Sequence, residues 1–364
     1  MSWLALVDKA ERRYSLRGIG HDRKDRRLHP ESEDYLLRCG SIVFETRISP
    51  DRRPQPLLAF NRSWPNQRSL TFQAIPGGGI SMVQVEGETI AHAAVQHALP
   101  ARTDVLRVTF SWDCRRQLAR LTVERPETHQ ITSTIVRDVQ PLPLADLRRW
   151  ILGRGDQRID PDVIFLALSD EFEAVGPSPT LHPDAMIETG QGFRRAGDLT
   201  SGDTLRSRDG NLTPILHRVD RVVPARGSAA PLRLRAPYFG LRDDVVVAPE
   251  QRLVIDGSEV EYLFNQEAVL VPARHLVNGF SATEEPVFPT ARYTQFILPA
   301  HETICAAGTM LESLYLGRLR RNTGLLPATI LHRFERNHLP EHAAPVYKEL
   351  QWYDAIHLAR QRVA

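Results

Sequence analysis

The stretch from 180 to 203, TLHPDAMIETGQGFRRAGDLTSGD, constrains the fold of this chain more than any other segment. Residues 185–189 form a short apolar run that predicts a strand, and Gly190-Gln191-Gly192 predicts a tight turn behind it. Residues 196–203 are rich in turn formers and lead into a second predicted strand at 204–207. This order of strand, glycine turn, turn-rich link and strand indicates that a β-rich domain begins near 180.

Short predicted strands continue beyond this stretch. Asp209-Gly210 favours a hairpin between 204–207 and a strand at 213–217, and Asp256-Gly257 favours another hairpin turn. Residues 272–279 predict a single helical turn that ends at Asn-Gly. The further strands we expect are 232–235, 244–247, 252–255, 268–271, 293–298 and 302–306.

Three further blocks follow in order, VVVAPEQRLVI, VLVPARHLVNG and YTQFILPAHETICAAGTMLESL. Together with the opening stretch they resemble the Hedgehog/intein (Hint) autoprocessing domain of the bacterial type, from Pro179 to about Gly317. The resemblance implies an all-β horseshoe of strands. It also implies a self-processing reaction, which in that family uses a cysteine at the first position.

The positions that matter for that reaction are occupied differently here. Aligned on the opening stretch, the family's cysteine falls on Thr180, and its first histidine falls on Gln251. The second histidine position holds Gln295, the aspartate position holds Pro299, and His301 is the titratable candidate that remains. An acyl shift needs a nucleophile, a group that moves the proton and donors for the oxyanion. Glutamine can donate a hydrogen bond but cannot carry a proton.

Two interpretations of these residues stay open. In the active one, Thr180 attacks the Pro179 carbonyl in an N-to-O acyl shift, Gln251 serves as oxyanion donor, and His301 carries the proton, with His182 close by in sequence. In the inactive one they are a loop threonine, a glutamine that supports the fold and a core histidine. We expect the inactive one, because three changes at once fit a loss of chemistry better than separate causes.

The N-terminal half predicts a β-sandwich at 34–140. Its short runs alternate apolar and polar residues and are bounded by Pro, Gly or Asn. The segments SIVFETRIS, VTFSWD and ARLTVERP, with a hairpin turn at 113–116, resemble the laminin-G/concanavalin-like jelly roll. The runs that predict strands are 35–39, 41–48, 57–60, 69–75, 79–85, 105–112 and 118–124.

Three residues of this half are candidates for ligand binding. Trp64 and Trp112 have the side chain that stacks on sugars, but a core or rim position is the expected role of both. Asp113 stands without the further acids that a calcium ion takes, so we expect no calcium site.

The remaining segments set the domain organisation. We expect a polar arm or short helix at 1–33 and a stretch at 141–179 that holds a helix (145–152), a strand (163–168) and a Pro-rich linker. The Hint-like domain then covers 180–317, and a helical tail covers 318–364. The fold class is therefore mainly β, a jelly-roll-like sandwich followed by the Hint-like domain.

Composition excludes several classes of partner. Lys and Arg number 46 against 44 Asp and Glu, which gives no long-range attraction to nucleic acid. The three cysteines lie far apart and have no zinc spacing, so we expect no disulfide, metal or cofactor. No apolar run approaches the length of a membrane span, and no signal peptide is recognisable. We expect a cytoplasmic protein, with secretion by a signal-less route open.

The sequence thus predicts a Hint-type protein that does not process itself and serves as a scaffold or interaction module for a protein partner. One alternative is autocatalytic cleavage at Pro179-Thr180 by an N-to-O acyl shift. Another is a lectin-like protein whose sandwich binds sugars or surfaces, for which we expect only weak glycan affinity.

Overall fold

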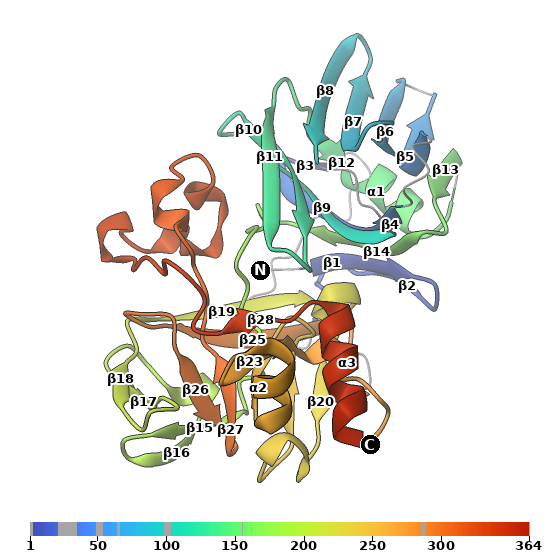
Figure 1. The fold of residues 1–364 in the computed structure, drawn as a ribbon. Coiled ribbons are helices and arrows are strands. Elements are labelled where there is room, and N and C mark those ends of the chain that lie inside the picture. The colour runs from blue at the N-terminus through green and yellow to red at the C-terminus, as the bar shows by residue number, and fades with distance from the viewer. Residues whose placement is uncertain are drawn as a thin grey trace. The chain divides into compact units, whose positions relative to one another are not determined.

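The computed structural model describes residues 3–20, 35–48, 54–63, 66–97, 103–154, 156–285 and 288–363. The chain is mainly β, as predicted, and divides into two compact units, Met1–Gly176 and Pro177–Ala364 (Figure 1). Across these described ranges, no helix combines the length and the apolar character that a membrane crossing requires.

The first unit is a sandwich of two antiparallel sheets. The seven-stranded sheet has the order β11-β10-β9-β4-β14-β1-β2, and the five-stranded sheet has the order β13-β5-β6-β7-β8. A two-stranded ribbon, β3 (Leu36–Leu37) with β12 (Leu142–Pro143), leads into the helix α1 (Leu144–Ile151). The bounds of the other strands are β1 (Trp3–Asp8), β2 (Arg12–Tyr14), β4 (Cys39–Ile48), β5 (Gln55–Arg62), β6 (Arg68–Ala74), β7 (Gly79–Glu86), β8 (Thr89–Gln96), β9 (Asp104–Asp113), β10 (Leu118–Arg125), β11 (Gln130–Val136), β13 (Asp156–Ile159) and β14 (Val163–Ser169).

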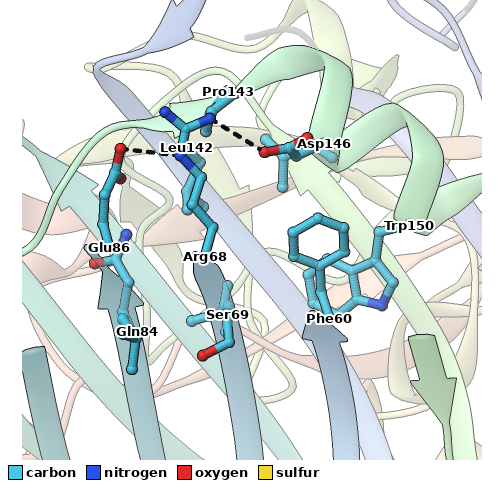
Figure 2. Close-up of a pocket in the computed structure, with 12 residues that line it drawn as sticks. Phe60, Arg68, Ser69, Gln84, Glu86, Leu142, Pro143, Asp146 and Trp150 are labelled. Carbon is cyan, nitrogen blue, oxygen red and sulfur yellow. Dashed lines mark hydrogen bonds and ion pairs between the residues drawn. The ribbon is translucent and has the colours of Figure 1, made fainter. Parts of the chain in front are cut away.

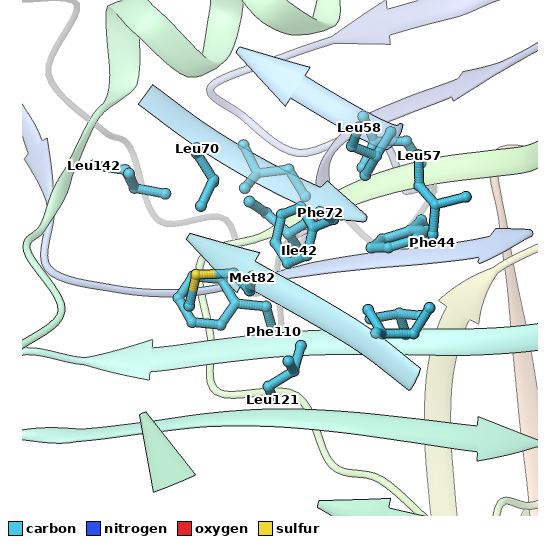
Figure 3. Packing of buried hydrophobic residues seen from close by; sticks show 14 of the residues in the cluster. Ile42, Phe44, Leu57, Leu58, Leu70, Phe72, Met82, Phe110, Leu121 and Leu142 are labelled. Carbon is cyan, nitrogen blue, oxygen red and sulfur yellow. The ribbon is translucent and has the colours of Figure 1, made fainter. Parts of the chain in front are cut away.

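Alternating side chains of both sheets meet in one apolar core (Figure 3). Phe72 of β6 lies edge-on to Phe44 and Phe110 of the other sheet, with ring centroids 5.3 and 5.9 Å away. Trp112 stacks on Phe110 and donates its indole N–H to the Leu37 carbonyl. Trp112 is therefore a buried core residue, whereas Trp64 lies outside the described residues.

The predicted N-terminal arm is wrong over its first residues. β1 (Trp3–Asp8) is a buried strand that pairs with β14 on one side and with β2 on the other. Its apolar side chains find their partner strand more than 150 residues later, so no local pattern reveals the pairing. Residues 21–34, the rest of the predicted arm, lie outside the described residues.

The stretch predicted as helix, strand and linker belongs largely to the sandwich. α1 and β14 lie where the helix and strand were predicted, and β14 lies inside the seven-stranded sheet, between β4 and β1. Most of the segment 141–179 therefore belongs to the first unit, which ends at Gly176. In the sequence, β14 looks like part of a connection between domains. Its long-range antiparallel pairing with β1 and β4 makes it an interior strand of the sheet.

The second unit contains a nine-stranded sheet, a two-stranded pair and a three-stranded sheet. The large sheet has the order β18-β17-β15-β26-β27-β22-β23-β28, with β16 beside β15. Its strands are β15 (Met186–Thr189), β16 (Gly192–Arg195), β17 (Thr204–Arg206), β18 (Leu212–Pro214), β22 (Arg252–Asp256), β23 (Ala268–Pro272), β26 (Thr303–Ala306), β27 (Thr309–Glu312) and β28 (Lys348–Glu349). The smaller sheets contain β19 (His217–Pro224) with β25 (Thr290–Ile297), and β20 (Leu232–Leu234) with β21 (Val245–Val247) and β24 (Ala282–Glu284).

Two parts of this unit differ from expectation. The predicted hairpin turn at Asp256-Gly257 instead opens the helix α2 (Ser258–Phe264), where Gly257 takes a φ of 116° that other residues rarely adopt. The tail is less helical than predicted, because its first part consists of short 3₁₀ turns. The helix α3 (Trp352–Val363) closes the described chain and packs beside α2 (Figure 1). The 3₁₀ turns of the tail are Leu319–Arg321, Leu326–Ala328, Ile330–Arg333 and Arg336–His338.

Candidate functional site

Backbone hydrogen bonds hold Thr180 in place at the start of the second unit. Its carbonyl accepts from Ala248 N at 2.7 Å, and the next residue, Leu181, bridges Val247 and Thr294. The backbone at Leu181 thus lies between β21 and β25. Since Thr180 is partly buried, its side chain points into a protein environment.

The side chain of Thr180 meets two glutamines. Its hydroxyl donates to Gln251 Oε1 at 2.6 Å, and Gln295 Nε2 donates to Thr180 Oγ1 at 3.1 Å. Gln295 Nε2 also lies 3.0 Å from Gln251 Oε1. The sequence comparison placed Thr180 and Gln251 in one site, and the structure brings them together with Gln295.

The surrounding carbonyls fix which end of each amide faces the threonine. Gln251 Nε2 donates to the carbonyls of Arg252 and Glu312, so its oxygen is the atom turned toward Thr180. Gln295 Nε2 donates to the Glu312 carbonyl, and Gln295 Oε1 accepts from Phe296 N. Both glutamines are at most 2% exposed. The hydroxyl of Thr180 therefore donates its hydrogen bond to a neutral amide oxygen, Gln251 Oε1.

His301 is not in contact with these three side chains in the described structure. Its Nε2 lies 3.0 Å from Glu312 Oε1, and its Nδ1 accepts a hydrogen bond from Val346 N at 2.9 Å. Because Nδ1 is an acceptor, the ring carries its proton on Nε2, which faces the carboxylate. Among the described contacts, His301 makes no hydrogen bond to Thr180 or Gln251, and Glu312 is the link between His301 and the glutamines.

Glu312 connects a buried charge cluster to the amide network. Its carboxylate binds Arg252 Nη1 at 2.5 Å, and Arg252 Nε lies 3.0 Å from Glu349 of β28. Burial alone would raise the pKa of Glu312, but Arg252 and His301 outweigh it and hold that pKa below its usual value. The sequence analysis missed Arg252 and Glu312, although each lies within a block that it had singled out.

His182 does not complete the site. Its ring is 39% exposed, and its Nδ1 accepts from Asp184 N at 3.3 Å, near the Asp184 carboxylate. Within the described ranges, no cluster of three or more His, Cys, Asp or Glu side chains is arranged to hold a metal ion.

Comparison with known proteins bears on this unit directly. Residues 179–318 match the model of the Hint domain family. The segment 179–318 therefore carries a Hint domain. None of the curated proteins compared matches the chain.

Comparison of the whole chain with solved structures gives several distantly similar proteins. The CBM40 of the Ruminococcus gnavus IT-sialidase bound to α2,6-sialyllactose has a TM-score of 0.28 and 13% identity, over 37% of this chain and 78% of that one. The LG1-3 region of the laminin α2 chain has a TM-score of 0.25 and 7% identity, over 79% and 63%. Scytalido-glutamic peptidase gives 0.20 and 8%, over 58% and 92%. Similarity at this level carries no argument about function.

The Hint domain can be assessed chemically from its own contacts. A hydroxyl nucleophile needs a base that takes its proton, and the acceptor here is the amide oxygen of Gln251. The charged groups nearby, Glu312 and Arg252, are already paired with each other. Among the described residues, the arrangement supplies hydrogen bonds around Thr180 but no base in contact with its hydroxyl.

Proposed function

We propose that the Hint domain of this chain does not process itself and serves as a rigid scaffold or interaction module. One contact supports this most directly: the Thr180 hydroxyl donates a hydrogen bond to Gln251 Oε1 at 2.6 Å. An amide oxygen is too weak a base to remove that proton near neutral pH. Loss of a general base typically lowers the rate by ~10²–10⁴, and a hydroxyl is also a weaker nucleophile than a thiol.

The network also has a structural role that needs no reaction. Gln251 and Gln295 join residues of β22, β25 and β27 by donating to the buried carbonyls of Arg252 and Glu312. A reactive site leaves a group free to change its protonation state, whereas here each amide is committed to several hydrogen bonds. The same side-chain positions then stabilise the fold as polar cross-links.

The test is the intact mass of the full chain after several days at neutral pH, alone, with a thiol and with hydroxylamine. We expect a single species at 41.2 kDa in all three samples. A pair of fragments that separate between Pro179 and Thr180 would refute the proposal and establish the N-to-O acyl shift. The matched control is Thr180→Ala, which removes the hydroxyl and should likewise give a single intact species in all three samples.

A further inference from the structure

The edge strands on one side of the sandwich differ in kind from those on the other side. β8 ends the five-stranded sheet and β11 ends the seven-stranded sheet, and the two strands pack beside each other (Figure 1). The opposite edges of the two sheets are β13 and β2. The side formed by β8 and β11, here called the β8–β11 side, belongs to the first unit and is independent of the function proposed for the Hint domain.

The edges at β2 and β13 are short and charged. β2 has three residues, among them Arg12 and Arg13, and β13 has four, among them Asp156 and Arg158. Proteins commonly protect their edge strands in this way, because a short or charged edge pairs poorly with a strand of another chain.

The β8–β11 side has none of these protections. β8 (TIAHAAVQ) has eight residues and β11 (QITSTIV) has seven, and neither contains Asp, Glu, Lys, Arg or Pro. Each strand pairs along its whole length with its neighbour, β7 or β10, without a bulge. Figure 2 shows that Arg68 of β6 lies between Glu86 of β7 and Asp146 of α1, so the charges of these inner strands are paired with each other and with the helix.

The backbone of β8 presents hydrogen-bonding groups at the open edge. The hydrogen bond from His97 N to Gly78 O sets the pattern of the β7–β8 ladder. Since alternate residues of an antiparallel strand bond to the neighbour, Ile90, His92 and Ala94 direct their N–H and C=O groups away from β7. Among the residues that the structure describes, no hydrogen bond joins these groups to a partner.

The side chains of β8 also suit an added strand. Ile90, His92 and Ala94 are exposed, Ile90 by 60%, whereas the inward-facing apolar side chains of β8 are at most 9% exposed and belong to the core. A strand that pairs with β8 therefore covers Ile90 and leaves the packing of the sandwich unchanged.

A second copy of the chain fits this side better than an extended peptide does. A two-fold axis normal to the sheets sets β8 antiparallel to β8 of the other copy and β11 antiparallel to β11, so both edges gain a partner at once. A peptide strand covers only one of the two edges. Because neither strand contains a charged residue, like strands do not repel each other. A side about 27 Å long and about 20 Å deep offers roughly 500 Å² per copy, at the lower end of specific interfaces.

We infer that the β8–β11 side joins two copies of this chain into a reversible two-fold dimer. Both sheets continue across the interface, and the edge-facing groups of β8 supply its backbone hydrogen bonds. The test is sedimentation velocity of the full chain at pH 8, from micromolar to millimolar concentration. We expect the mass to rise with concentration from 41.2 kDa toward twice that value. Hydrogen exchange followed by mass spectrometry should show protection of the β8 peptide at high concentration only.

Two pairs of variants locate the interface. His92 lies near the middle of β8, where the two-fold axis brings both copies of one residue closest. His92→Lys places two like charges there and should weaken dimerisation at least about tenfold, whereas the uncharged His92→Gln should dimerise like the wild type. Ala94→Pro removes an edge-facing N–H and should weaken dimerisation too, whereas Ala94→Val retains that N–H and should not. The thermal unfolding midpoint shows which variants are folded, and the His92 pair decides alone if Ala94→Pro is not.

Three results would overturn the inference. One is a mass of 41.2 kDa at every concentration. Another is a dimer that His92→Lys and a folded Ala94→Pro leave as strong as that of the wild type, which would place the interface elsewhere. The third is a dimer in which the β8 peptide exchanges as fast as in the monomer.

Discussion

Arg252 donates a hydrogen bond of 2.5 Å to the carboxylate of Glu312, and both side chains are more than nine-tenths buried. The backbone carbonyl of the same Glu312 accepts from Gln251 and from Gln295. One residue of β27 therefore joins the buried charges to the amides around Thr180. The Arg252–Glu312 pair holds β27 in place, and β27 in turn supplies the carbonyl that orients Gln251 and Gln295 beside Thr180.

The pair leads to a prediction about stability. Glu312→Gln removes the buried carboxylate that faces Arg252 while Glu349 stays in place, and loss of one member of a buried pair typically costs about 3–5 kcal/mol. We expect a loss of that size in urea unfolding followed by near-UV circular dichroism. Asp256→Asn breaks the exposed Arg208–Asp256 pair and should cost at most about 1 kcal/mol. Equal losses for the two variants would contradict the role of burial.

The family resemblance related Thr180 to Gln251, and the structure shows the two in contact, but the resemblance did not reveal what surrounds them. The two residues lie 71 positions apart, and only the family resemblance relates them. Glu312 lies beyond the last strand that the sequence predicted, 302–306, and Arg252 opens the strand predicted at 252–255. Their pairing depends on β22 and β27 lying side by side, which no local pattern specifies. His301 was a candidate because it was the titratable residue that remained, and the structure shows it in contact with Glu312 and with Val346 of the tail.

The fold was predictable where short alternating runs are bounded by turns. β6, β7, β9 and β10 lie where their runs predicted them. β1 was missed because its pairing partner, β14, lies at the other end of the unit. α2 was missed because Asp256-Gly257 is a strong hairpin signal, yet the residues that follow bury Val260 on a short helix.

The tail should lose stability in mild acid. His342 Nδ1 accepts from Leu316 N, and its Nε2 faces the Leu298 carbonyl, so the ring is bound in its neutral form. Burial lowers the pKa of His342 below its usual 6.5. Its contribution to stability is therefore complete above pH 6.5 and is lost as the pH falls through the lower pKa of the folded state.

Urea unfolding at a series of pH values checks this. The wild type should lose stability below pH 6.5 more steeply than His342→Gln, whose amide can replace both hydrogen bonds without titrating. His338→Gln, which changes an exposed histidine of the same tail, serves as control. Parallel pH profiles for the wild type and His342→Gln would show that His342 does not carry the effect.

The sandwich should be insensitive to calcium. Asp113 Oδ1 accepts from the backbone N–H groups of Arg115 and Arg116, so the carboxylate shapes the turn between β9 and β10. Calcium takes six to eight oxygen ligands, and a turn-capping carboxylate supplies too few. We expect the same thermal midpoint with millimolar calcium and with EDTA. A midpoint that rises with calcium would contradict this interpretation and would favour a metal-dependent lectin.

The last prediction concerns restored chemistry at Thr180. Thr180→Cys alone should remain intact, because Gln251 still offers only an amide oxygen to the new thiol. In Thr180→Cys with Gln251→His, a neutral imidazole at the position of that oxygen can take the proton, so the thiolate can attack the Pro179 carbonyl. The peptide bond before residue 180 then becomes a thioester, which an added thiol cleaves.

Intact mass with and without thiol measures this outcome. The double variant should form fragments that separate between residues 179 and 180, at a rate ~10²–10⁴ above that of Thr180→Cys. The gain should require both changes, because the residues of a catalytic unit act non-additively. Thr180→Ala with Gln251→His has the base without the nucleophile and should stay whole. If Thr180→Cys alone cleaves as fast as the double variant, then the lack of a base at position 251 is not what prevents self-cleavage of this Hint domain. If the double variant also stays whole, the ring of Pro179 holds the carbonyl away from the attack geometry, and the missing base is not the limiting defect.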